Sequence, residues 1–131
     1  MDIKICGLKT EEAVRAAIDG GATHAGFIFF AKSPRYVDAK TAARLAALAS
    51  TANVRSVAVT VDADDATLDE IVSVMKPDML QLHGKESPER VAAVKARHGL
   101  PVMKAVGIAD ANDLPKLESY FGVADQILVD A

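Results

Sequence analysis

The stretch Asp2-Ile3-Lys4-Ile5-Cys6-Gly7-Leu8-Lys9-Thr10 opens the chain and decides its fold. It is a short apolar run that ends in a thiol and a glycine, and a helical pattern follows at once. A strand that begins a βα unit delivers the residue at its carboxyl end to the region where α/β proteins bind ligands. The only cysteine of the chain, Cys6, is therefore expected where chemistry is usually done.

The same order of strand and helix continues to the end of the sequence. Short apolar runs recur at Ile3–Cys6, Ala25–Phe30, Val54–Val61, Met79–Leu82, Val102–Val106 and Gln126–Val129. Such runs are typical of parallel strands that are covered on both faces. Helical patterns with one apolar stripe lie between them, and right-handed crossovers turn such βα units into a parallel sheet. The close spacing of the strands favours a barrel over an open doubly wound sheet.

Residues that satisfy free backbone groups mark the predicted helix boundaries. N-cap oxygens are expected at the starts of the first four helices, at Thr10, Asp38, the acidic cluster Asp62–Asp65 and Ser87. Pro115 would interrupt a helix that began at Asp110, because proline lacks the N–H that a helix interior needs. The fifth helix is therefore predicted to start nearer Asp113.

Composition limits the classes of protein to consider. The chain has 131 residues, of which 50% are hydrophobic and 25% charged, as in ordinary globular domains. A formal net charge of -3 provides no basic field, so nucleic acid and anionic membranes are not expected as partners. No apolar run approaches the roughly 20 residues of a membrane span, and no signal peptide is recognisable. The sequence predicts a cytoplasmic protein.

The number of strands predicts an open fold. A (β/α)8 TIM barrel needs eight strands and about 200 residues or more, whereas this sequence offers six strands and five helices. The first and last strands would then expose unpaired edges, which can pair with another chain. We therefore predict that residues 1–131 form one incomplete TIM-barrel domain, that the sequence is a piece of a longer protein, and that its edges can form a homo-oligomer.

Four motifs, in order along the whole chain, resemble the phosphoribosylanthranilate isomerase family of tryptophan biosynthesis. They are Lys4-Ile5-Cys6-Gly7-Leu8, Gly26-Phe27-Ile28-Phe29 with Lys32-Ser33-Pro34-Arg35-Tyr36-Val37, Gln81-Leu82-His83-Gly84, and Ile127-Leu128-Val129-Asp130. The resemblance implies a TIM barrel and an Amadori rearrangement of N-(5-phosphoribosyl)anthranilate to 1-(2-carboxyphenylamino)-1-deoxyribulose 5-phosphate. It implies an aldose–ketose isomerase, that is, an intramolecular oxidoreductase, which uses acid–base catalysis without a cofactor.

The resemblance also implies a role for each candidate site residue. Cys6 is the general base and Asp130 the general acid, and both follow strands whose carboxyl ends meet at one mouth in a barrel. Arg35 is expected to hold the anthranilate carboxylate through its planar guanidinium group. Gln81 and His83 are expected near the sugar, because alternation along a strand sends both to one face.

Other interpretations of these residues stay open. Cys6 also fits a buried structural thiol, and Arg35 a solvated loop residue. Gln81 and His83 also fit a core pair bonded to the backbone. His24 and His98 are interpreted as structural, because the histidines lack the spacing of metal ligands.

Two alternative functions follow from the same pattern. Five βα repeats also describe a flavodoxin-like receiver domain, although a receiver needs an acidic cluster where this chain has Cys6-Gly7-Leu8. A catalytically silent fragment that pairs its open edges with another copy is the second alternative. The phosphate site of such barrels is built after strands 7 and 8. We therefore predict that the 131-residue chain lacks isomerase activity by itself.

Overall fold

Strands and helices alternate along the whole described part of the chain. The computed structural model describes residues 1–130. Its strands are β1 (Lys4–Cys6), β2 (His24–Ile28), β3 (Arg55–Thr60), β4 (Met79–Leu82), β5 (Val102–Gly107) and β6 (Gln126–Asp130). Its helices are α1 (Glu11–Asp19), α2 (Ala39–Thr51), α3 (Asp65–Met75), α4 (Pro88–His98), the 3-10 turn η1 (Ala111–Asp113) and α5 (Leu114–Glu118).

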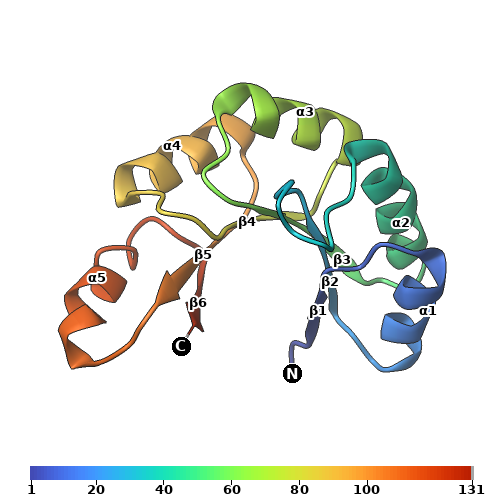
Figure 1. Ribbon diagram of the computed structural model, residues 1–131, viewed down its shortest axis with the longest axis horizontal. Coiled ribbons are helices and arrows are strands. Elements are labelled where there is room, and N and C mark those ends of the chain that lie inside the picture. Colours follow the sequence, from blue (N-terminus) through green and yellow to red (C-terminus); the bar gives the residue numbers. More distant parts are fainter. Residues whose placement is uncertain (131) are drawn as a thin grey trace.

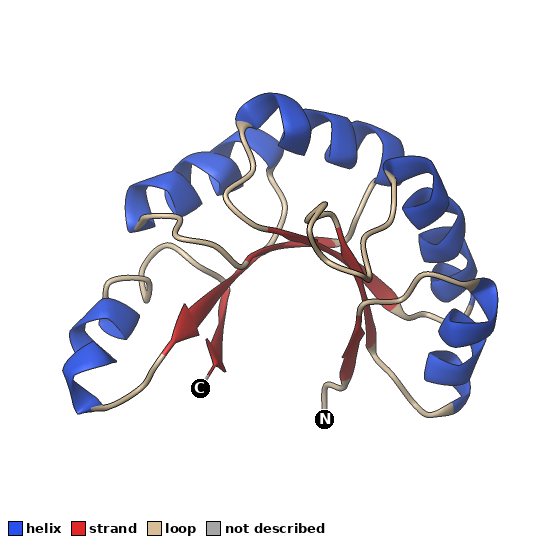
Figure 2. Ribbon diagram, viewed as in Figure 1, coloured by secondary structure: helices blue, strands red, loops and turns tan. Residues whose placement is uncertain are grey.

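The six strands form one parallel sheet in the order β1-β2-β3-β4-β5-β6. The sheet curves into an arc, the helices cover its convex side, and both chain ends lie at the open side of the arc (Figure 1). Strands line the inner side throughout (Figure 2). A flavodoxin-like sheet reverses its strand order at a switch point. The sequential order therefore contradicts the receiver alternative and agrees with an incomplete barrel.

The predicted helix starts are correct. Side-chain oxygens of Thr10, Asp38, Asp64 and Ser87 accept hydrogen bonds from backbone N–H groups in the first turns of α1 to α4. Helix α5 begins directly after Asp113, as predicted, but a 3-10 turn capped by Asp110 precedes it. In residues 1–130 no helix combines the length and the hydropathy needed to cross a membrane.

Alternate residues of the central strands β2 to β5 contribute to two different cores. One set faces the helices and includes Phe27, Leu80 and Val106, all buried in the main core cluster. The other set faces the concave side, where Val57 and Val59 belong to a smaller apolar cluster. This second face is the inner surface of the incomplete barrel, and it positions the candidate site.

The edge strands are exposed, as predicted for an open sheet. Ile5 of β1 is 41% exposed and Val129 of β6 is 56% exposed. Strands between them are almost fully covered; all four residues of β4, for example, are buried. The central strands are therefore packed on both faces, whereas the edge strands β1 and β6 expose apolar side chains.

Candidate active site

A pocket opens on the concave side of the sheet, at the carboxyl ends of the strands. It has a volume of about 370 Å³, and its lining includes Cys6, Arg35, Gln81 and His83. Asp130 lies at its margin, where its carboxylate oxygen Oδ2 is 3.6 Å from Nε2 of His83. The structure thus brings four of the predicted site residues into one pocket and places the fifth in contact with one of them.

Gln81 of β4 and His83, which directly follows β4, form a hydrogen-bonded pair in the pocket lining. Nε2 of Gln81 lies 3.0 Å from Nδ1 of His83. An amide nitrogen only donates, so Nδ1 accepts and a neutral imidazole carries its proton on Nε2, on the side of Asp130. The side-chain oxygen of Gln81 is buried and has no hydrogen-bond partner among residues 1–130. Such an orphaned acceptor at a pocket wall is suited to a ligand hydroxyl group.

Cys6 ends β1 as a half-buried free thiol. The next residue, Gly7, has a left-handed φ of +83°, and its N–H donates to the carbonyl oxygen of Gly26 at 3.0 Å. A Cβ atom at Gly7 would lie only 2.5 Å from Cδ of Arg35. Glycine is therefore required here for backbone conformation and for the approach of Arg35.

Arg35 reaches Cys6 from the loop between β2 and α2. Its Nη1 donates to the carbonyl oxygen of Cys6 at 3.5 Å. The loop is tied down by Lys9, whose Nζ donates to the carbonyl oxygen of Pro34 at 3.0 Å. The backbone N–H of Arg35 donates to Oγ of Ser33 at 3.1 Å. These contacts leave the guanidinium group largely exposed at the pocket.

Lys4 lines the same pocket and was not among the predicted site residues. The signal for it was present in the sequence, because Lys4 and Cys6 are two positions apart on one strand and alternation sends them to one face. A second cation therefore faces the pocket beside Arg35.

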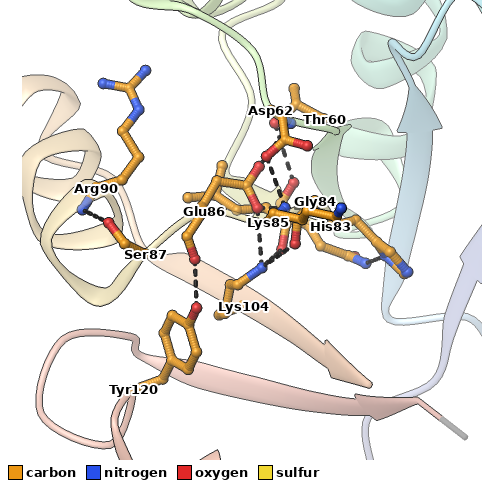
Figure 3. A network of polar contacts seen from close by, with 12 residues as sticks. Thr60, Asp62, His83, Gly84, Lys85, Glu86, Ser87, Arg90, Lys104 and Tyr120 are labelled. Carbon is orange, nitrogen blue, oxygen red and sulfur yellow. Dashed lines mark hydrogen bonds and ion pairs between the residues drawn. The ribbon is translucent and has the colours of Figure 1, made fainter. Parts of the chain in front are cut away.

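A buried polar network behind His83 was also missed (Figure 3). Nζ of Lys104 lies 3.0 Å from Oε1 of Glu86, and the two side chains are 3% and 4% exposed. Burial opposes ionisation of Glu86, but hydrogen bonds from Lys104 and from backbone N–H groups outweigh it and hold the pKa of its carboxyl group below the ordinary value. The Glu86 carboxyl group is therefore ionised at neutral pH.

Tyr120 also belongs to this network and contacts the backbone of Glu86. Its hydroxyl group donates to the backbone carbonyl oxygen of Glu86. Burial, and then the nearby charge of Glu86, raise the pKa of the Tyr120 phenol. The Lys104 ammonium also lies 5.5 Å from the centre of the Tyr120 ring. The phenol therefore stays protonated and keeps its role as a donor.

The remaining histidines lie away from the pocket lining. Nδ1 of His24 is 2.8 Å from Oγ1 of Thr23, and the His98 side chain is 5% exposed beside Asp69. Within residues 1–130 no three His, Cys, Asp or Glu side chains are grouped as metal ligands would be.

Comparison with known proteins gives consistent matches. A family model described as N-(5'phosphoribosyl)anthranilate (PRA) isomerase matches residues 3–131. The N-(5'-phosphoribosyl)anthranilate isomerase of Chelativorans sp. (strain BNC1) is 64% identical over 131 residues, which are 100% of this chain and 60% of that protein. The chain spans about 60% of the length of the curated relatives it matches.

Solved structures agree with these matches. The phosphoribosyl anthranilate isomerase from Thermotoga maritima superposes with a TM-score of 0.90 at 29% identity, over 99% of this chain and 61% of that one. A complex of such an isomerase with reduced 1-(o-carboxyphenylamino)-1-deoxyribulose 5-phosphate also gives a TM-score of 0.90 at 29% identity, over 99% of this chain and 64% of that one.

Proposed function

The chain belongs to the N-(5'-phosphoribosyl)anthranilate isomerase family, and we propose that it supplies the acid–base groups of that isomerase active site. The observation that carries the proposal is the shared pocket: Cys6 and His83 line it together, and Asp130 contacts His83. The substrate is a phosphosugar, N-(5'-phosphoribosyl)anthranilate, and the product is the corresponding 1-amino-1-deoxyketose phosphate of tryptophan biosynthesis.

The chemistry needs one acid and one base. The carboxyl group of Asp130 gives a proton to the furanose ring oxygen, and the ring opens to a protonated imine. Cys6, acting as the general base, then removes the proton from C2′, which gives an enolamine. A proton is added back at C1′ as the C2′ hydroxyl group loses its own, and the ketone forms. C2′ is oxidised and C1′ is reduced within one molecule, so the rearrangement is balanced by proton transfers alone. No cofactor enters this scheme.

Three further residues bind the substrate in this proposal. The planar guanidinium of Arg35 pairs with the anthranilate carboxylate. The unpartnered side-chain oxygen of Gln81 accepts a hydrogen bond from a sugar hydroxyl group. Nε2 of His83 lies 3.6 Å from Oδ2 of Asp130, and in this proposal His83 orients that carboxyl group toward the ring oxygen. We assign the phosphate anchor to the loops that follow strands 7 and 8 of a complete barrel, where barrels of this type bind phosphate.

A chimaera tests the proposal directly. It joins residues 1–131 of this chain to the part of the Chelativorans isomerase that follows the matched segment. We expect the chimaera to convert N-(5'-phosphoribosyl)anthranilate, measured by chromatographic separation of substrate and product. The control is the same Chelativorans segment alone. A folded chimaera without turnover would contradict the proposed function.

Several further properties belong to the same proposal. We propose that residues 1–131 form a single domain and that the chain alone lacks activity, because the phosphate sites of TIM barrels are built after strands 7 and 8. The single unpaired thiol suits a reducing, cytoplasmic compartment.

The exposed apolar edges of β1 and β6 favour a homo-oligomer. Light scattering at several concentrations measures this association, and a strictly monomeric chain would contradict it.

A further inference from the structure

We propose that the buried Glu86–Lys104 pair is a positioning device that holds His83 toward Asp130, an inference that rests on the function proposed above. Neither residue lines the pocket. Both act through the backbone of Gly84, which directly follows His83 (Figure 3).

The pair binds both polar backbone groups of Gly84. Its N–H donates to Oε1 of Glu86 at 2.8 Å, and its carbonyl oxygen accepts from Nζ of Lys104 at 2.7 Å. On the amino-terminal side of the same residue, the backbone N–H of His83 donates to the carbonyl oxygen of Thr60 at 2.8 Å. The peptide groups around His83 are thus fixed by partners from β3, β5 and the β4–α4 loop. The imidazole direction follows from this backbone.

Asp62 adds a second set of hydrogen bonds to the same network. Its N–H donates to Oε2 of Glu86 at 2.9 Å, and its Oδ1 accepts from the N–H of Lys85 at 2.7 Å. A Cβ atom at Gly84 would lie 2.6 Å from the Asp62 carboxylate, so only glycine admits this contact. The end of β3 is thereby locked to the segment that follows His83.

Stability alone does not explain the pair. A buried ion pair loses hydration and is often no more stabilising than apolar residues of the same size. Lys104 stands in the layer between sheet and helices, where its neighbours in the strand are apolar. The pair instead orients the backbone around it, because Glu86 accepts hydrogen bonds from two backbone N–H groups and from the ammonium group of Lys104. Glu86 and Lys104 lie outside the pocket lining, yet in this way they set the orientation of His83, which lines the pocket.

Four variants separate positioning from stability, each in the chain and in the chimaera. Lys104→Met and Glu86→Gln break the pair, and the double variant removes both charges. Arg97→Met is the matched control, because it removes another cation paired with a carboxylate, Asp69 at 2.6 Å, on the outer side of α4. Urea unfolding gives stability, and exchange of the Gly84 amide hydrogen reports the held backbone. The imidazole ¹⁵N shifts of His83 report its tautomer.

We expect both single variants to lower kcat of the chimaera by about 10- to 100-fold, with KM changing less. The double variant regains stability relative to Lys104→Met, because no unpaired charge stays buried, while its kcat stays low. Arg97→Met leaves kcat unchanged. The inference is overturned if kcat returns together with stability in the double variant, or if Arg97→Met lowers kcat equally.

The ¹⁵N readout needs no activity and is measured on the chain itself. We expect the His83 shifts to move toward tautomer-averaged values in Lys104→Met and Glu86→Gln, but not in Arg97→Met. Unchanged shifts in both single variants would overturn the inference even if the chimaera is active. An inactive wild-type chimaera with the expected shift changes would instead contradict only the proposed reaction.

Discussion

The two sides of the pocket are held in place by different means. On the β4 side, His83 is followed by a backbone whose N–H and carbonyl groups are bound by buried, charged partners. On the β1 side, Cys6 is followed by Gly7, and Arg35 reaches it through one long hydrogen bond of 3.5 Å. The groups proposed for chemistry and substrate binding thus keep free atoms, whereas the groups that orient them have their partners within the chain.

This difference follows from the cost of burying charge. An ammonium and a carboxylate are tolerated in the interior only when hydrogen bonds replace their lost hydration, so Lys104 and Glu86 must be saturated. A half-buried cysteine such as Cys6 needs no such set of hydrogen bonds, because its side chain packs as a small apolar group. The β4 side of the pocket is therefore backed by a buried, fully hydrogen-bonded ion pair, whereas the β1 side needs no such support.

The largest effect is expected where the proposed proton transfers occur. In the chimaera, Cys6→Ser and Asp130→Asn each remove a group that moves a proton, so kcat should fall by about 10²- to 10⁴-fold. Steady-state kinetics measure this loss, and circular dichroism checks that both variants fold like the parent. A Cys6→Ser variant with nearly normal kcat would show that the base is another residue.

The fold was largely predictable from the sequence, because its signals are local. Apolar runs marked the strands, and Thr10 and Ser87 marked helix starts within one turn. The alternation of side chains along a strand also predicted that Gln81 and His83 lie on one face, and both line the pocket. Local patterns report which face a side chain takes, and that is enough to assemble a sheet in sequential order.

The supporting network was not predictable in the same way. Lys104 lies inside an apolar run and Glu86 in a loop, and the two are separated by 18 positions in sequence. Their pairing depends on the parallel register that sets β4 beside β5. The hydrogen bond from Arg35 to the carbonyl oxygen of Cys6 likewise depends on the path of a loop. Neither contact has a periodic signal in one sequence.

The second prediction concerns the pH dependence of the β4 side. The pKa of Glu86 is lower in the folded chain than its ordinary value of 4.5. Its stabilising contribution is therefore fully present above that ordinary value and is lost as pH falls through the folded-state pKa. We expect the free energy of unfolding to fall over this pH range, measured by urea unfolding from neutral to acidic pH. Glu86→Gln should lack this part of the pH slope; an unchanged slope would contradict the assignment.

The third prediction concerns the β1 side. Gly7→Ala places a side chain at a left-handed φ, which costs about 1 to 2 kcal/mol, and pushes a Cβ atom against Arg35. We expect lower stability in urea and a raised KM in the chimaera. Gly21→Ala is the matched control, since Gly21 has a φ of +88° and nothing within 4 Å of an added Cβ. Equal KM changes in both variants would mean that backbone strain, and not the Arg35 contact, controls binding.

The smallest effect is expected at an exposed ion pair whose geometry resembles that of the buried one. Nη2 of Arg15 lies 2.8 Å from Oε1 of Glu11, close to the 3.0 Å of Lys104 and Glu86, but the two side chains are 60% and 58% exposed. Water and salt screen such a pair, so Arg15→Gln should leave the urea midpoint unchanged at low and high salt. Lys104→Met should shift it clearly at both, because its partner stays buried without a counter-charge. If Arg15→Gln destabilised the chain as much as Lys104→Met, the distance between charges rather than their burial would govern both pairs, and the contrast between the two sides of the pocket would lose its physical basis.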